Sequence, residues 1–311
     1  MGEVAEWDVF EVLEPASQRI PFVFNSPHSG RYYPQTFLEQ SRLDSHSIRR
    51  SEDHFVDELF QSATHLGAPL LRAHFPRAFL DVNREPYELD PRMFDGVLPA
   101  HANISSMRVA GGLGTVPRLV AENMEIYRSR FPVEEALARI EAIYKPYHAT
   151  LRKLIARTHV QFGMAVLVDC HSMPGNVHLP GSGQRPDFII GDRYGTSAAA
   201  ELSRVAVELL EGLGYAVTRN KPYAGGFITE HYGRRRAVCT RFRSRSTAAS
   251  MSTSRHWSKS PDSPPWPPIL RPSSRRWRAM SRITAPICRS PRNSRQISCA
   301  QKEPRQGRGQ V

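Results

Sequence analysis

The stretch that most constrains this chain is Ala165–Pro174, which reads Ala-Val-Leu-Val-Asp-Cys-His-Ser-Met-Pro. Its apolar, β-branched first half ends abruptly in polar residues, as a buried parallel strand does where its carboxyl end opens into a site. Pro21–Asn25, followed by Ser-Pro-His-Ser-Gly, ends in the same way. Because ligands in open α/β sheets bind outside the carboxyl ends of strands, we expect His28 and His171 to lie at two edges of one crevice.

Strands alternate with helices along the first 233 residues. The hydrophobic patterns predict strands over 20–25, 69–74, 78–82, 165–170, 187–190 and 215–219. They predict helices over 52–65, 118–130, 132–161 (kinked at Pro146) and 196–213. This alternation indicates an α/β fold, a three-layer sandwich around a largely parallel or mixed sheet. Residues 85–117 look irregular, and loops of this length usually shape binding sites.

The net charge of +12 hides two unlike parts. Residues 234–311 contain 17 Arg and two Lys against Asp262 and Glu303, a net of +17, so the remaining 233 residues carry −5. A basic tail is able to bind nucleic acid. Such tails usually carry many Lys and interleaved Gly or aromatic residues, whereas here three Trp lie among prolines without pattern, and we expect no nucleic-acid partner.

Other classes are disfavoured by composition. No apolar run is long enough for a membrane span, so we expect no membrane partner. The acidic Met1–Glu14 lacks the basic and apolar regions of a signal peptide. Four irregularly placed cysteines predict neither a disulfide framework nor a metal knuckle. A cytoplasmic location is therefore expected.

A metal site is the chemistry that the polar residues favour. His28 and His171 are imidazoles at strand ends, and Asp53 is an oxygen donor at a helix start. Two His and one carboxylate leave a coordination position open, the pattern of a catalytic zinc site, where the metal polarises a carbonyl and activates water. The alternatives are that each His is a hydrogen-bonded core or loop residue and that Asp53 only complements the helix dipole. Asp169 is a candidate hydrogen-bond partner for an imidazole.

Candidate substrate-binding residues follow two further segments. Asn83 and Arg84 could clamp a carboxylate, although a local salt bridge of Arg84 with Glu85 or Glu88 is the simpler interpretation. The Gly225–Gly226 pair permits close backbone approach to a ligand, and His231 lies beyond it.

Seven blocks in order resemble the N-formylglutamate amidohydrolase family across about residues 20–233. They are Ser-Pro-His-Ser-Gly (26–30), Ser-Glu-Asp-His-Phe-Val-Asp-Glu-Leu (51–59), Phe-Leu-Asp-Val-Asn-Arg (79–84), Gly-Thr-Val-Pro-Arg (114–118), Val-Asp-Cys-His-Ser-Met (168–173), Asp-Phe-Ile-Ile-Gly-Asp-Arg-Tyr-Gly (187–195) and Gly-Gly-Phe-Ile-Thr-Glu-His-Tyr-Gly (225–233). Together they are far more specific than any one block.

The resemblance implies a zinc-exopeptidase-like fold and hydrolysis of the formamide of N-formyl-L-glutamate to glutamate and formate, in histidine degradation. By match to the family's motifs, the Zn²⁺ ligands would be His28, Asp53 and His171, with Glu52 as the alternative carboxylate. Asn83 and Arg84 would hold a substrate carboxylate. The other enzyme hypothesis is a zinc carboxypeptidase-like hydrolase of another N-acyl amino acid or amide, which the 85–117 loop would distinguish.

After Gly233 the chain departs from the family. The family continues with a segment of the type Leu-His-Ala-Leu-Gln-Ile-Glu-Ile-Asn-Arg, whose Glu resembles the general base of zinc carboxypeptidases, whereas this chain is Arg-rich. When the third base of each codon is read with the first two of the next, permitted codons from Ala237 onward restore that segment. The missing Glu then falls across Ser244 and Arg245.

We therefore interpret residues from about 234 onward as a frameshifted translation. The expected organisation is an amidohydrolase domain over 1–233, incomplete at its C-terminal end, and an Arg/Ser/Pro-rich tail over 234–311. Such a tail cannot bury a core and is expected to be disordered and non-native.

Overall fold

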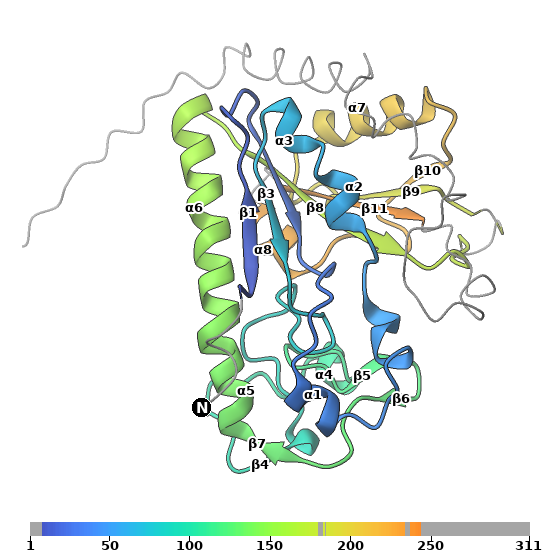
Figure 1. The fold of residues 1–311 in the computed structure, drawn as a ribbon. Coiled ribbons are helices and arrows are strands. Elements are labelled where there is room, and N and C mark those ends of the chain that lie inside the picture. Colours follow the sequence, from blue (N-terminus) through green and yellow to red (C-terminus); the bar gives the residue numbers. More distant parts are fainter. Residues whose placement is uncertain (1–7, 180–182, 184, 234–236, 244–311) are drawn as a thin grey trace, which may run out of the picture.

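A computed structural model describes residues 8–179, 183, 185–233 and 237–243, the last segment by its backbone alone. Its centre is a seven-stranded mixed sheet in the order β1-β3-β2-β8-β11-β9-β10 (Figure 1). The strands are β1 (Phe10–Leu13), β2 (Phe22–Ser26), β3 (Leu70–Ala73), β8 (Val166–Met173), β9 (Phe188–Gly191), β10 (Val217–Arg219) and β11 (Ala237–Arg243). The α/β class and the mixed sheet predicted from the sequence are confirmed.

Helices pack on both faces of this sheet, and strand residues alternate between two cores. Val23 and Leu167 face one core, shared with α6 (Lys145–Phe162) and α8 (Phe227–Gly233). Phe24 and Val168 face the other, shared with α2 (Val56–Phe60), α3 (Ala63–Leu66) and α7 (Ala200–Glu211). Burial on both faces explains why β2 and β8 are continuously apolar before their polar ends.

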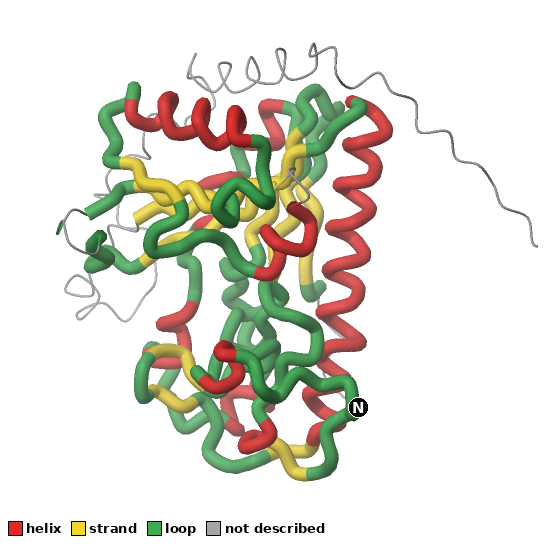
Figure 2. The backbone as a smooth tube through the Cα atoms, turned by 180° about the vertical axis from the view of Figure 1, so that it is seen from behind, coloured by secondary structure: helices red, strands yellow, loops and turns green. Residues whose placement is uncertain are grey.

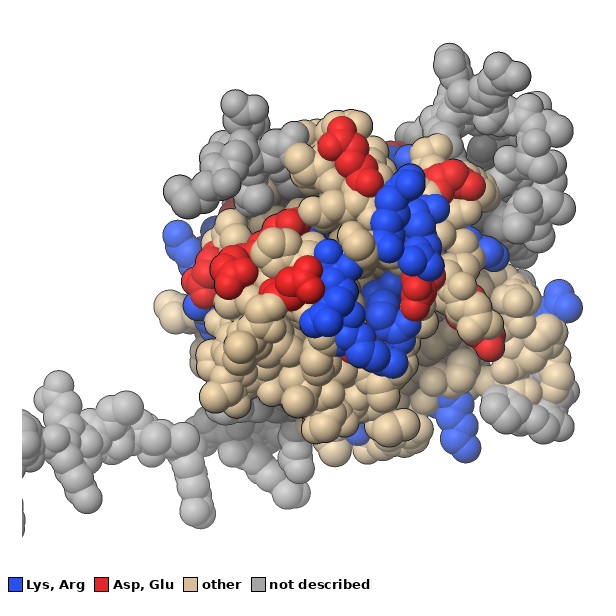
Figure 3. All heavy atoms as spheres, turned by 90° about the horizontal axis from the view of Figure 1, so that it is seen from below, with Lys and Arg blue, Asp and Glu red and all other residues tan. Residues whose placement is uncertain are grey.

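Residues 75–132 form a lower lobe beneath the sheet, together with α1 (Gln35–Gln40) (Figures 1 and 2). Its small elements are α4 (Met107–Ala110), the pair β4 (Phe94–Asp95) and β7 (Phe131–Pro132), and the pair β5 (Leu119–Ala121) and β6 (Met124–Glu125). Short 3₁₀ turns lie at Ser47–Ser51 and Pro91–Met93. Seen from below, basic and acidic side chains mix on this face (Figure 3).

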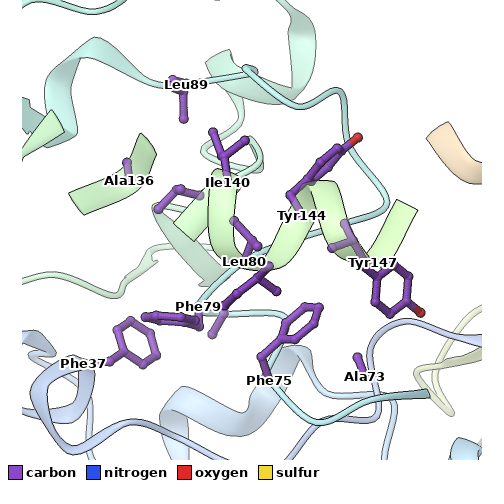
Figure 4. Close-up of a cluster of buried hydrophobic side chains, with 14 of the residues drawn as sticks. Phe37, Ala73, Phe75, Phe79, Leu80, Leu89, Ala136, Ile140, Tyr144 and Tyr147 are labelled. Carbon is purple, nitrogen blue, oxygen red and sulfur yellow. The ribbon is translucent and has the colours of Figure 1, made fainter. Parts of the chain in front are cut away.

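The apolar core of the lower lobe joins it to the long helix. Figure 4 shows Phe37, Phe79, Leu80 and Leu89 gathered around Ile140 and its neighbours. Because Phe79 and Leu80 lie in this core, the polar residues that follow them are held firmly at the edge of the sheet.

Three predicted elements are wrong. Residues 78–82 form buried turns rather than a strand, since their side chains are held by core packing and their backbone by hydrogen bonds such as Asp81 N to Thr115 O. Residues 118–130 hold the β5–β6 pair instead of a helix. The helix predicted over 52–65 is broken, because Phe55 adopts a left-handed conformation (φ 60°) just before α2.

The helix predicted over 132–161 is confirmed, but its kink takes another form. It consists of α5 (Val133–Arg139), a π-helical turn (Ile140–Tyr144) and α6. The wider turn directly precedes Pro146, which lacks the amide hydrogen for an ordinary helical bond.

The sheet extends past the boundary predicted at residue 233. Strand β11 lies between β8 and β9, parallel to β8 with Arg241 opposite His171, and antiparallel to β9. Residues 237–243 of the predicted tail therefore form a strand of the sheet, because backbone pairing requires no particular side chains. The rest of the predicted tail, 234–236 and 244–311, lies outside the described residues. The hydrophobic patterns predicted neither β1 nor α8.

One buried cation ties the long helix to the segment that carries Asp81. Arg139 is 1% exposed, its guanidinium lies 4.0 Å from the centre of the Phe79 ring, and it pairs with Glu135. It also donates to the Phe79 carbonyl (3.3 Å) and to the Tyr127 hydroxyl (2.8 Å).

We predict that Arg139→Met lowers the free energy of unfolding by about 3 kcal/mol, because it strips two buried acceptors of their donor. Arg157→Met is the matched control, since Arg157 makes a solvent-exposed pair with Glu14 that should contribute less than about 1 kcal/mol. Urea unfolding measures the free energy of unfolding of both variants, and equal losses in the two would contradict this account of Arg139.

Candidate active site

Two neighbouring strands deliver the two histidines. β2 and β8 run parallel with Asn25 opposite Asp169, and each strand leads into its histidine at the carboxyl end. The rings of His28 and His171 lie 4.9 Å apart between centroids, and both residues are 1% exposed. The two histidines thus lie together at the ends of adjacent strands, as the sequence predicts.

Asp53 completes a group of three. Its backbone amide donates to the His28 carbonyl (3.0 Å), and the left-handed Phe55 turns the chain into α2 directly after it. Its Oδ2 lies 2.9 Å from His171 Nδ1 and 3.5 Å from His28 Nδ1. The ligand atoms of the three residues lie within 4.8 Å of one another, so the group could hold a metal ion.

The far nitrogen of each imidazole is already bonded to a carboxylate. His28 Nε2 donates to Asp81 Oδ1 and His171 Nε2 to Asp169 Oδ2, both at 2.8 Å. With the protons fixed on Nε2, both Nδ1 lone pairs face Asp53. His28 Nδ1 is buried and makes no hydrogen bond within the described part of the chain. A buried acceptor without a donor is costly, and a cation at this point would satisfy it.

Asp53 and Asp81 are held in their charged form. Burial acts to raise the pKa of Asp53, but the His171 and His28 imidazoles beside it outweigh this effect, so this pKa lies well below its ordinary value. Burial also acts to raise the pKa of Asp81. The neighbouring Arg84, Arg77 and His28 outweigh this effect, so the pKa of Asp81 too lies well below its ordinary value. The site therefore presents an anionic oxygen beside two imidazoles, which is a combination of ligands that zinc binds.

The alternative carboxylate, Glu52, points elsewhere. It accepts from Tyr33 (2.7 Å) and from Arg49 (3.1 Å), and lies 2.9 Å from His54 Nδ1. These contacts anchor the segment around Asp53, and they favour Asp53 over Glu52 as the metal-facing carboxylate.

Arg84 lies at this edge, but it is more restrained than the sequence suggests. Its Nε donates to the Leu113 carbonyl (2.7 Å), its Nη1 to the Asn83 carbonyl (2.8 Å), and its Nη2 lies 3.4 Å from Asp81. The local partner is thus Asp81 rather than Glu85 or Glu88. Burial lowers the pKa of Arg84 to about 10, although Asp81 opposes this, and the charges of Arg77 and Arg108 lower it further. Arg77 and Arg84 therefore share Asp81, the carboxylate behind His28.

Asn83 and the glycine pair face each other. Asn83 Oδ1 accepts from Ile228 N (2.8 Å), and its Nδ2 lies 3.3 Å from Asp169 Oδ2. A Cβ on Gly226 would lie 2.4 Å from Asn83 Oδ1, so the close approach predicted for the glycines is made to Asn83. Gly225 needs its positive φ of 121° for this turn. His231, on α8, stacks against Phe227 with 5.0 Å between centroids.

Sequence reasoning missed several residues of the site. Asp81 and Asn25 were not assigned roles, although each is a polar residue at the end of an apolar run, the signal that identified the histidines. Arg77, which donates to Asp81 Oδ2 (3.0 Å), and Tyr147, which donates to Asn25 Oδ1 (2.6 Å), carry no such signal. The expectation that Asp169 bonds an imidazole is confirmed.

Comparison with known proteins identifies the family. The model of the N-formylglutamate amidohydrolase family matches residues 20–241, more than two thirds of the chain. The chain belongs to the N-formylglutamate amidohydrolase family. The match includes the three clustered residues, the segment that holds Asp81 to Arg84, and α8.

Relatives and solved structures agree with this membership. The N-formylglutamate deformylases of Pseudomonas putida and Pseudomonas aeruginosa are each 28% identical to it, over 72% of this chain and 78% and 79% of theirs. The crystal structure of N-formylglutamate amidohydrolase from Ralstonia eutropha is 31% identical, with a TM-score of 0.70 over 75% of this chain and 85% of that one. A gene product of Agrobacterium tumefaciens, 21% identical with a TM-score of 0.56 over 77% of this chain and 86% of that one, shares the fold.

Among the described residues, no helix has the length and apolar character needed to cross a membrane.

His148 on α6 clamps the segment before Asn83. Its Nε2 donates to the Val82 carbonyl and its Nδ1 accepts from the Tyr232 hydroxyl, both at 2.8 Å. Burial lowers the pKa of His148 from 6.5 to about 4, so the folded protein holds it neutral at pH 7. The clamp joins α6, α8 and the Asp81–Arg84 segment.

We predict that this clamp makes the family fold acid-sensitive. Because the folded pKa lies below the unfolded one, its contribution is complete above about pH 6.5 and is lost as pH falls towards 4. The free energy of unfolding should drop by about 2 kcal/mol more between pH 7 and pH 5 in the wild type than in His148→Gln. Replacement of the exposed His65 by Gln is the control, and identical pH profiles for wild type and His148→Gln would exclude the clamp as the cause.

Proposed function

We propose that this chain carries the site of a metal-dependent amidohydrolase that cleaves the formamide of N-formyl-L-glutamate to glutamate and formate. The observation that carries the proposal is the buried, unbonded Nδ1 of His28 aimed at the same point as His171 Nδ1 and Asp53 Oδ2. Membership of the family supports the substrate, since its named relatives are N-formylglutamate deformylases.

Zn²⁺ is the metal that this ligand set fits best, and His28, Asp53 and His171 would hold it. When bound, such an ion supplies a Lewis acid for the formyl carbonyl and for water. The protein's own part is to aim the Nδ1 atoms of both imidazoles at Asp53, through the bonds of their Nε2 atoms to Asp81 and Asp169. This set of two histidines and one carboxylate, together with the helices on both faces of one sheet, also supports our proposal of a three-layer, zinc-exopeptidase-like architecture.

The arginines supply the complement to an anionic substrate. N-formylglutamate has two carboxylates, and Arg84 lies with Arg77 on Asp81, the partner of His28, where the charge of Arg108 also acts on Arg84. We assign one substrate carboxylate to Arg84 and Asn83, and we assign Gly225, Gly226 and His231 to the same substrate-binding region. Arg108 belongs to the irregular 85–117 segment, so this segment would distinguish N-formylglutamate from other N-acyl amino acids.

A general base is the missing part. The three described carboxylates that contact the histidines are each already engaged: Asp53 as a ligand, Asp81 with two arginines, and Asp169 with two asparagines. By resemblance, the base of the family falls at Ser244 and Arg245, outside the described residues. We therefore propose that the chain with its present residues after 234 is impaired, and that the original reading frame encodes a Glu there.

One experiment tests the function and the missing base together. The 311-residue chain and a chain with the frame restored from residue 237 are compared for formate release from N-formyl-L-glutamate. We expect the restored chain to turn over at an ordinary enzyme rate, on the order of 10 per second, and the present chain to be at least about a hundredfold slower. A chelator should abolish the activity of the restored chain, and added Zn²⁺ should return it.

The two parts fail separately. Ordinary turnover by the present chain would show that it needs no residue from the restored segment. A restored chain that folds, binds zinc and leaves N-formylglutamate intact would overturn the proposed substrate.

A further inference from the structure

His171 lies at the end of a series of buried hydrogen bonds that begins at Tyr147 on helix α6. The Tyr147 hydroxyl donates to Asn25 Oδ1 (2.6 Å), Asn25 Nδ2 donates to Asp169 Oδ1 (2.7 Å), and Asp169 Oδ2 accepts from His171 Nε2 (2.8 Å). Tyr147, Asn25 and Asp169 are fully buried, and His171 is 1% exposed. The series thus connects α6, β2 and β8 without contact with solvent.

The direction of these bonds is fixed from one end. A phenol bonded to an amide oxygen must donate, because that oxygen has no proton to give. Asn25 therefore presents its NH₂ group to Asp169, so Asp169 must accept at Oδ1. The remaining carboxylate oxygen then accepts the proton of His171 Nε2, which leaves the lone pair on Nδ1, on the side of Asp53.

The hydroxyl that starts the series is held in place and kept neutral. The Tyr147 ring makes edge contacts with Phe10 and Phe75, at 5.4 and 5.9 Å between centroids (Figure 4 labels Phe75 and Tyr147). Burial, with the charge of Asp169, raises the pKa of Tyr147 well above its ordinary value. Tyr147 is therefore a donor at every pH at which the protein folds.

The two histidines are supported in different ways. Asp81, behind His28, is shared with Arg77 (3.0 Å) and Arg84 (3.4 Å), so two cations draw on its charge. Asp169, behind His171, receives only the neutral amides of Asn25 and Asn83 besides the imidazole, within the described contacts. Its charge is therefore more available to strengthen His171 as a ligand.

We propose that Tyr147 and Asn25 are positioning residues that fix the tautomer of His171 and thereby set the affinity of the site for a divalent metal ion. This rests on the proposed function only in requiring that the site binds a metal. Without the Tyr147 hydroxyl, Asn25 Oδ1 is left buried without its donor, and the amide that holds Asp169 loses its anchor. Asp169 is then held less firmly behind His171 Nε2, so the orientation and tautomer of His171 are less well fixed for metal binding.

The test measures metal affinity in the full chain, independently of hydrolysis. Zn²⁺ and Co²⁺ are titrated against a chromophoric chelator, and the Co²⁺ absorption spectrum is recorded for each protein. Tyr147→Phe keeps the ring contacts and removes the hydroxyl, and we expect its metal dissociation constant to rise about tenfold, with a changed Co²⁺ spectrum. Asn25→Ser, too short to reach Asp169, should cause a similar or larger loss.

Tyr127→Phe is the matched control. It also removes a buried hydroxyl, one that accepts from Arg139 (2.8 Å) in the core of the lower lobe, so it should lower stability and leave metal affinity unchanged. Wild-type affinity in Tyr147→Phe and Asn25→Ser, or an equal loss in Tyr127→Phe, would overturn the proposal. If Tyr147→Phe does not fold, the Asn25→Ser titration decides the question alone.

Formate release separates this inference from the proposed function. A wild-type chain that binds Zn²⁺ tightly, with the expected loss in Tyr147→Phe, supports the positioning role even if N-formylglutamate is not its substrate. A wild-type chain that binds neither ion overturns the positioning role together with the metal site.

Discussion

The structure depends on two imidazole–carboxylate hydrogen bonds at the ends of adjacent parallel strands. His28 to Asp81 and His171 to Asp169 place the protons on the Nε2 atoms. Both Nδ1 atoms then converge on Asp53 in a buried space. In the absence of a cation, this arrangement leaves a desolvated acceptor unpaired, a cost that a folded protein tolerates at functional sites.

The rest of the fold holds these bonds in register. Asp81 follows a segment packed into the lower lobe, where Arg139 and Phe79 fix its backbone. Asp53 is delivered by a chain reversal at Phe55 and by the anchoring of Glu52. The strands bring the histidines together, while irregular segments bring the carboxylate and the arginines, so side chains distant in sequence meet at one edge of the sheet.

Much of this was readable from the sequence because strand ends have a strong local signature. The apolar-to-polar change after residues 25 and 168 predicted that both histidines lie together and that Asp169 bonds an imidazole. The strand predicted over residues 78–82 is wrong, because an apolar run buried in the core of a lobe has the sequence pattern of a strand although its backbone is hydrogen-bonded to loops. Arg77, Tyr147 and the restraint on Arg84 were not predictable, since their partners are set by tertiary contacts between segments far apart in the sequence.

The central claim is that both histidines bind a metal through Nδ1, with Asp53 as the third protein ligand. The most direct measurement is a crystal structure of the zinc-loaded chain, with the ion located by its anomalous scattering. The account predicts one ion at about 2.0–2.2 Å from His28 Nδ1, His171 Nδ1 and an Asp53 oxygen, with both Nε2 atoms still bonded to Asp81 and Asp169. An ion bound through either Nε2, or held by Glu52 instead of Asp53, would contradict it.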